Sequence, residues 1–364
     1  MQDRYVADEA RVSISSLEAE TIMKSTPVQT VKSILGRIGI EYEDGLPKEA
    51  YISALKEEFC SELKWVLLML PKVMLDFLTE VWENSVIAMT EERWNYIEYL
   101  KIFGFLAYQM GNPVTDEPNR LIVVEEMKDN FYFLLKSRKN RKLLSVYDEW
   151  EKIITGFMYY YGFIETRTLY SLFLKVSKKV ISYEDFLLFI KCRTSLWPFG
   201  AILKDTFEKN EYFQYLNVEN PDMLLEYVRQ HENLPYKPIK LEDLIYISDA
   251  AGIDNRWRGV SELGNLFIDK MGLNYYRATV LVRTLLIMIK NGSSYEKLQE
   301  KVSILSFENA QIREEVQQAV RQIFENVPVF EYKGYSRAEY KRLSYQKQLK
   351  KRKNLFTIID GGKE

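Results

Sequence analysis

The chain has 364 residues, of which 47% are hydrophobic and 28% are charged, with 16 glycines and 10 prolines. This balance is typical of folded globular proteins, and the length allows two or three domains with cores of their own. The two cysteines, Cys60 and Cys192, and the single histidine, His231, exclude a disulfide framework and do not suggest a four-ligand zinc site. Reduced thiols of this kind are typical of a cytoplasmic protein, which is the localisation we expect.

No segment of the sequence predicts membrane insertion. The N-terminus lacks the charged and apolar regions of a secretory signal. The most apolar window, Trp65 to Leu75, is broken by Pro71 and Lys72 and has about half the length needed to cross a bilayer. We therefore expect no membrane-spanning helix.

The formal net charge of −2 conceals an uneven distribution. Between Lys333 and Lys353 there are nine basic residues and one acid, Glu339, so this segment carries +8 and the rest of the chain −10. A polyanion would be repelled by most of the chain and attracted to this C-terminal segment.

The first 60 residues predict a lead followed by a small helical unit. Residues 1–25 are polar and weakly patterned, and we expect a frayed segment or a short helix. Over 26–60 the apolar spacing predicts a helix, a short extended link, and a second helix that opens at Leu46-Pro47-Lys48. This helix-extended-helix pattern resembles SAP and Rho-N-terminal domains, which are found in nucleic-acid proteins.

Residues 61–140 and 141–235 show the same order of patterns. Each region predicts three helices followed by two short apolar runs around a polar loop, which is the signature of a β-hairpin and the order of a winged-helix domain. In the first region the third helix is capped by Thr90, and in the second a further helix follows the hairpin. We expect two winged-helix-like modules in tandem. The alternative is one irregular helical bundle with two incidental hairpins.

The last third of the chain predicts helices alone. Five helical patterns with short connections fill residues 236–330 and predict an antiparallel bundle. Ser336 to Glu339 forms a Ser-x-x-Glu capping box at the start of a basic helix in the C-terminal segment, 331–364. The expected fold class is therefore mostly α.

Five stretches together carry a family resemblance: Leu35 to Ile40, Leu46 to Phe59, Tyr160 to Ile164, Tyr236 to Ala251, and Asn326 to Tyr340. The layout resembles uncharacterised helical proteins of low-GC Gram-positive bacteria and their mobile elements. The last stretch is similar to an Asn-Thr-Pro…Lys-Gly-His/Tyr-Thr-Pro-Glu-Leu signature of that family, with departures at residues 327, 330, 336 and 337. Some relatives carry a SEC-C zinc motif, which is absent here. The resemblance implies no established activity.

The sequence shows no catalytic motif. A phosphate-binding loop and a dinucleotide-binding Gly-x-Gly-x-x-Gly motif are both absent. A Ser or Cys nucleophile would need His231 as its base, but this histidine lies at a polar helix end, where we expect it to be solvated. Glu331-Tyr332-Lys333 is similar to the Glu-x-Lys of metal-dependent nucleases, yet no strand-borne Asp accompanies it. We expect no enzyme, cofactor or metal.

The charges decide where nucleic acid could bind. The third helix of each expected module begins with carboxylates, Glu91 and Glu92 in the first and Glu184 and Asp185 in the second, which would meet the negative groove of a duplex. The C-terminal segment instead combines basic and aromatic residues suited to phosphates and bases. The candidate nucleic-acid-binding residues are Lys333, Arg337, Tyr340, Lys341, Arg342, Tyr345, Lys347, Lys350, Lys351, Arg352 and Lys353.

Two hypotheses follow. The first is a non-enzymatic interaction or adaptor protein whose modules contact protein partners. The second is a nucleic-acid-associated regulator of a phage or mobile element that binds non-specifically through residues 333–353. The cationic segment could also dock on the acidic part of its own chain.

Overall fold

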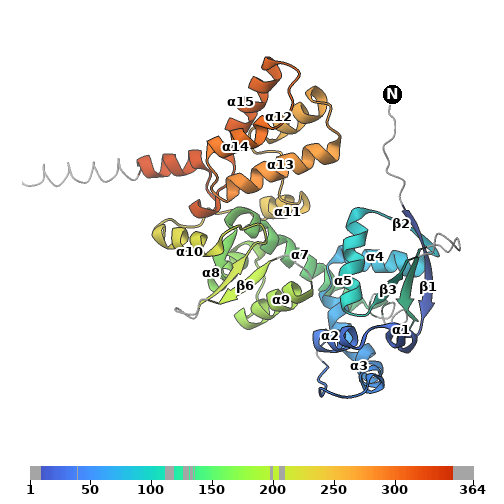
Figure 1. Cartoon of the computed structure of the whole chain (residues 1–364). Coiled ribbons are helices and arrows are strands. Elements are labelled where there is room, and N and C mark those ends of the chain that lie inside the picture. The colour runs from blue at the N-terminus through green and yellow to red at the C-terminus, as the bar shows by residue number, and fades with distance from the viewer. Residues whose placement is uncertain are drawn as a thin grey trace, which may run out of the picture. The chain divides into compact units, whose positions relative to one another are not determined.

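A computed structural model describes residues 10–38, 40–110, 119–125, 131, 134, 136–196, 200–204 and 210–346. The chain divides into two compact units (Figure 1). Unit 1 comprises Met1–Asp148 and Cys192–Trp197, and unit 2 comprises Glu149–Lys191 and Pro198–Glu364. The described part is mostly helical with a few short strands, which confirms the expected fold class at this level. None of its helices combines the length and the apolarity that crossing a bilayer requires.

Unit 1 contains a four-stranded sheet and its helices. The elements in chain order are β1 (Ala10–Leu17), α1 (Ala19–Ser25), α2 (Val28–Ile38), α3 (Lys48–Met69), α4 (Lys72–Glu83), β2 (Val86–Met89), α5 (Glu91–Ile102), β3 (Leu106–Gln109) and β4 (Arg120–Val124). The sheet order is β2-β1-β4-β3, with β1 antiparallel to β2 and parallel to β4. Thr90 accepts a hydrogen bond from the backbone N–H of Arg93, so the expected cap of α5 is confirmed.

The expectation of a frayed segment or a short helix in the lead is wrong for residues 10–17, which form the strand β1, whereas residues 19–25 form the short helix α1. Both elements contribute to the core, through Val12, Ile22 and Met23. In β1 the apolar residues alternate with serine, and a strand hydrogen-bonded on both sides needs only its alternate side chains buried. The boundary expected at 60/61 also falls inside α3, because no Gly or Pro interrupts the chain between residues 48 and 69.

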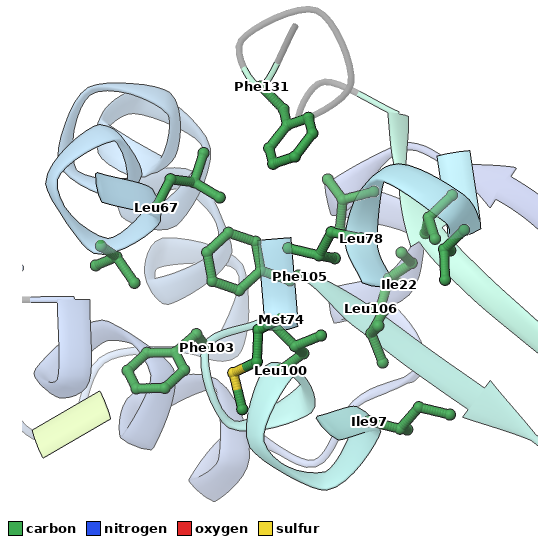
Figure 2. Packing of buried hydrophobic residues seen from close by; sticks show 14 of the residues in the cluster. Ile22, Leu67, Met74, Leu78, Ile97, Leu100, Phe103, Phe105, Leu106 and Phe131 are labelled. Atoms are coloured by element: carbon green, nitrogen blue, oxygen red, sulfur yellow. The ribbon is translucent and has the colours of Figure 1, made fainter. Parts of the chain in front are cut away.

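The core of unit 1 lies where the sheet meets its helices. Figure 2 labels members of this core, among them Met74 and Leu78 of α4, Ile97 and Leu100 of α5 and Leu106 of β3. All five side chains are buried. The burial of this apolar surface drives the packing of the two helices on the strands.

Unit 2 begins with a helical and stranded half. Its elements are α7 (Arg138–Tyr161), which belongs to the unit from Glu149 onward, β5 (Phe163–Glu165), α8 (Thr166–Ser177), α9 (Tyr183–Leu196), which belongs to the unit up to Lys191, β6 (Ala201–Lys204), β7 (Glu211–Gln214) and α10 (Pro221–Gln230). The three strands form an antiparallel sheet of order β5-β7-β6. Gly162 turns the chain from α7 into β5 at a φ of +67°, and Phe330 packs directly against it.

The second half of unit 2 is a helical bundle, as the sequence predicts. Its elements are α11 (Leu241–Asp249), α12 (Val260–Asn265), the π-helical turn η1 (Leu266–Lys270), α13 (Tyr275–Lys290), α14 (Tyr295–Ser303), α15 (Ala310–Asn326) and the 3-10 turn η2 (Phe330–Tyr332). Asn274, Ser294 and Asn309 cap α13, α14 and α15 through their side-chain oxygens. A final helix begins at residue 337 and is described to residue 346.

Two glycines test how closely the elements of unit 2 pack. A Cβ on Gly156 of α7 would lie 2.5 Å from the backbone oxygen of Leu244 in α11, whereas a Cβ on Gly264 of α12 would meet nothing within 4 Å. Helix propensity alone favours alanine at both positions.

We expect Gly264→Ala to raise the free energy of unfolding by about 0.5–1 kcal/mol. We expect Gly156→Ala to lower it by about 1–3 kcal/mol, because the added methyl forces two backbones apart. Denaturant unfolding of both variants measures the difference, and stabilisation by Gly156→Ala would contradict the packing of α7 on α11.

Candidate functional site

Two of the candidate nucleic-acid-binding cations lie inside unit 2. Lys333 is 5% exposed and Arg337 is 9% exposed. The Lys333 ammonium donates a hydrogen bond to the backbone oxygen of His231 at 2.8 Å. The Arg337 guanidinium donates to the backbone oxygens of Phe324 at 3.3 Å and Ser293 at 3.0 Å. Burial lowers the pKa of both groups. These positions hold the fold together and do not present charge to a partner.

The next residues of the C-terminal segment are partly engaged. The Lys341 ammonium lies 3.2 Å from the Glu325 carboxylate in an exposed ion pair. Arg342 is exposed, and its Nε donates to the backbone oxygen of Ala338. Tyr340 is half-buried, whereas Tyr345 is 63% exposed. Lys347, Lys350, Lys351, Arg352 and Lys353 lie outside the described residues, so their role stays a prediction.

The expectation that His231 is a solvated surface histidine is wrong. His231 ends α10 as expected, but it is half-buried among tyrosines. Its Nδ1 lies 2.9 Å from the backbone oxygen of Tyr227 and its Nε2 lies 3.1 Å from the Tyr340 hydroxyl. Tyr340 in turn stacks on Tyr332 with the ring centroids 4.3 Å apart. The histidine therefore anchors the last helix to α10.

The capping box expected at the start of the last helix is present. The backbone N–H of Ser336 donates to Glu339 Oε2 at 2.9 Å, and the backbone N–H of Glu339 donates to Ser336 Oγ at 3.3 Å. Lys237 also donates to this carboxylate at 2.7 Å. Burial opposes the ionisation of Glu339, but the hydrogen bonds from Lys237 and Ser336 outweigh it and lower its pKa.

Helix α9 presents carboxylates and an apolar side chain to solvent. Phe186, Phe189 and Ile190 are buried on its inner face. On the outer face Glu184 and Asp185 are exposed, and Leu188 is 58% exposed. The side chains of Glu91 and Glu92, at the start of α5, lie outside the described part of the chain.

A buried lysine that the sequence analysis overlooked lies at the end of α13. Lys290 is 3% exposed, and its ammonium donates to the backbone oxygen of Tyr159 at 2.9 Å. Tyr159 belongs to the last turn of α7, where carbonyl groups lack helical partners and the helix dipole is negative, so the cation caps that helix. Burial lowers the pKa of Lys290 to about 7, although the negative charge of Asp254 opposes the shift.

The local sequence does not predict that this lysine is buried. Lys290 follows the apolar run Leu285 to Ile289, and lysine in the last turn of a helix is ordinarily a favourable surface residue. The lysine also lines a cavity of about 100 Å³ together with Tyr159, Tyr215 and Arg283. Burial raises the pKa of both tyrosines.

No family model, curated protein or solved structure matches the chain. Within the ranges that the structure describes, there is no group of three or more His, Cys, Asp or Glu side chains that could hold a metal ion.

The buried ammonium makes stability depend on pH. The unfolded chain keeps Lys290 protonated up to about pH 10, whereas the folded chain releases the proton near pH 7. The unfolded state therefore binds more protons over this range, and stability rises with pH. We expect the free energy of unfolding of the wild type, relative to Lys290→Met, to increase by about 1 kcal/mol per pH unit between pH 7 and 9. Chemical unfolding at several pH values measures this difference, and a flat difference would mean that Lys290 stays charged in the folded protein.

The buried and exposed arginines of the C-terminal segment should behave differently. Arg337→Gln removes charge-assisted hydrogen bonds to two backbone oxygens and should lower the free energy of unfolding by about 2–4 kcal/mol. Arg342→Gln makes the same chemical change at an exposed position and should cost less than about 0.5 kcal/mol. Equal effects of the two variants in denaturant titrations would contradict the burial of Arg337.

Proposed function

We propose that the protein is a non-enzymatic interaction or adaptor protein in which a winged-helix-like module presents α9 to a protein partner. The observation on which this depends is the exposed face of α9, where Glu184 and Asp185 lie one turn before the exposed Leu188. An apolar side chain among carboxylates suits a protein surface that offers an apolar pocket with a basic rim.

The element order of unit 2 supports the module. A helix, a short strand, two helices and two further strands follow one another in α7, β5, α8, α9, β6 and β7. The first strand pairs with the last, which places β7 in the middle of the sheet. A winged helix has its third helix in the position of α9 and uses it for recognition. We propose this architecture for the second expected module, residues 141–235.

The element order of unit 1 differs from that of a winged helix. There β1, from the beginning of the chain, lies between β2 and β4, and β2 separates α4 from α5. This arrangement departs from three successive helices followed by a hairpin. Residues 26–60 form α2, a link at 40–47 that contains a turn, and the first part of α3, which is the helix-link-helix order expected of the SAP-like lead.

The charge on α9 favours protein over nucleic acid. Glu184 and Asp185 occupy the first turn of the helix, which is the turn that enters the major groove in nucleic-acid-binding winged helices. Asp185 is also held by its capping hydrogen bonds with Ser182, at 2.8 and 3.0 Å. A fixed carboxylate at this position would repel phosphate groups.

A partner capture experiment tests the adaptor proposal. Leu188→Asp places a charge on the exposed α9 face. The wild type should capture a protein partner from an extract of its native host, and we expect the variant not to capture it. Quantitative mass spectrometry of the captured proteins measures the difference. Ile304→Asp makes the same change at a position that is 76% exposed in the bundle and should leave capture unchanged. Retention of every partner by Leu188→Asp would reject α9 as the contact surface.

The alternative function is a nucleic-acid-associated regulator of a phage or mobile element, acting through the C-terminal segment. Arg342 and Tyr345 are exposed, and Lys347 and Lys350 to Lys353 follow them in the sequence. These residues could give salt-sensitive binding without sequence preference.

Truncation after Gln346 tests this alternative without disturbing the fold, because Lys333, Arg337 and Glu339 stay in place. If the segment binds nucleic acid, fluorescence anisotropy at about 50 mM salt should show binding of generic DNA or RNA by the full chain, and the truncated chain should lose it. Absence of binding by the full chain at this salt concentration would leave only the adaptor proposal.

A further inference from the structure

The cavity beside Lys290 has a polar lining with an unusual balance of charge. It has a volume of about 100 Å³, which exceeds the space for a single water several-fold. Its polar residues are Tyr159, Tyr215, Asn217, Arg283 and Lys290. Two of them carry cationic groups and none is a carboxylate. The cavity is therefore rich in hydrogen-bond donors.

The two tyrosines of the cavity are hydrogen-bonded to each other. Asn217 Nδ2 donates to the Tyr215 hydroxyl at 2.8 Å. The ring centroids of Tyr159 and Tyr215 lie 5.1 Å apart, and their side chains share a hydrogen bond. This bond uses one of the two hydroxyl protons, and the other has no acceptor among the described residues. The pair therefore keeps one unused donor.

Two cationic side chains add further unused donors. The Arg283 guanidinium is exposed and makes no hydrogen bond or ion pair within the described part of the chain. Burial raises the pKa of Tyr159 and Tyr215, and the positive charge of Arg283 opposes this rise. The Lys290 ammonium has three N–H groups and one hydrogen bond, to the Tyr159 backbone oxygen. It also lies over the rings of Tyr159 and Trp257, 5.3 and 4.9 Å from their centroids, but these contacts carry no net negative charge. Both residues belong to α13, which fixes them relative to each other.

The carboxylate whose charge acts on Lys290 is paired with another residue. Asp254 is 2% exposed and acts on the ammonium by charge, but its two oxygens are held by Arg256 at 2.9 and 2.7 Å. A buried cation without an ion pair is costly unless a counter-charge reaches it.

We propose that this cavity binds a small oxyanion, a carboxylate or phosphate group, through the hydroxyl of Tyr159, the guanidinium of Arg283 and the ammonium of Lys290. An oxyanion supplies the acceptors that the donors lack and the negative charge that the two cations lack. Arg283 is exposed to solvent, so its guanidinium is placed to make the first contact with an anion that enters the cavity. A guanidinium recognises planar carboxylates and phosphates with two parallel hydrogen bonds. The inference does not depend on the adaptor or nucleic-acid proposals.

Calorimetric titration of the full chain with inorganic phosphate and, separately, with acetate tests the site. We expect saturable millimolar or tighter binding of at least one probe, and the preferred probe identifies the group as phosphate or carboxylate. Arg283→Gln should weaken binding by about tenfold or more through loss of a charge-assisted contact. Arg277→Gln is the matched control, because it removes the same charge from an exposed position in the same helix that does not line the cavity.

Lys290 supplies an independent readout. Near neutral pH its amine is partly unprotonated, so a bound anion should raise its protonation and draw a proton from the buffer. The other charged groups around it are Asp254, Arg256 and Arg283, with Glu219 and Glu331 at an adjoining cavity that Lys290 also lines. At pH 8, the binding heat should depend on the ionisation enthalpy of the buffer in the wild type. Tyr159→Phe should keep this dependence while weakening binding.

Two results would overturn the proposal. One is the absence of saturable binding of both probes at millimolar concentration. The other is an equal loss of affinity in Arg283→Gln and Arg277→Gln, which would assign the effect to overall charge. Lys290→Met is a secondary variant because it removes a helix cap, whereas the exposed Arg283 can be replaced without disturbing the core.

Discussion

Three buried cations in unit 2 each donate a hydrogen bond to a carbonyl group at the end of a helix. Lys290 binds the last turn of α7 at Tyr159, Lys333 binds the end of α10 at His231, and Arg337 binds the last turn of α15 at Phe324. Helix ends expose carbonyl groups without partners and carry partial negative charge, so a cation there satisfies both needs at once. Since an unpaired buried charge is far more costly than a paired one, these contacts constrain the positions of three helices.

The segment from Val327 to Arg337 provides two of these cations and joins the halves of unit 2. Phe330 packs against Gly162 at the start of β5, and the backbone N–H of Lys237 donates to the Lys333 oxygen. The segment thus connects the stranded half to the bundle through the Phe330 ring, the backbone hydrogen bond between Lys237 and Lys333, and the charges of Lys333 and Arg337. It is a structural element, although its composition suggests a binding tail.

This arrangement explains why charge counted along the sequence misled the assignment of Lys333 and Arg337. A count treats every cation as exposed, whereas these two are used internally. The periodic signals were more reliable: Thr90 caps α5, Ser336 and Glu339 form the expected box, and α13 is a central buried helix. Such features depend on residues close in sequence, so local patterns can predict them. β1 was missed because its partners β2 and β4 lie over 70 residues away in the chain.

The cavity site could not be predicted for the same reason. Tyr159, Tyr215 and Lys290 come from separate elements, and none has a distinctive local sequence. What marks the lysine is its environment, which exists only in the folded chain. The ammonium is buried with one acceptor, so it destabilises the protein more than a surface lysine would. A cost of this kind is offset when a ligand brings the missing charge, and residues kept at the expense of stability are common at binding sites. Capping α7 accounts for one hydrogen bond of Lys290, while the proposed oxyanion accounts for its remaining donors and for those of Tyr159 and Arg283.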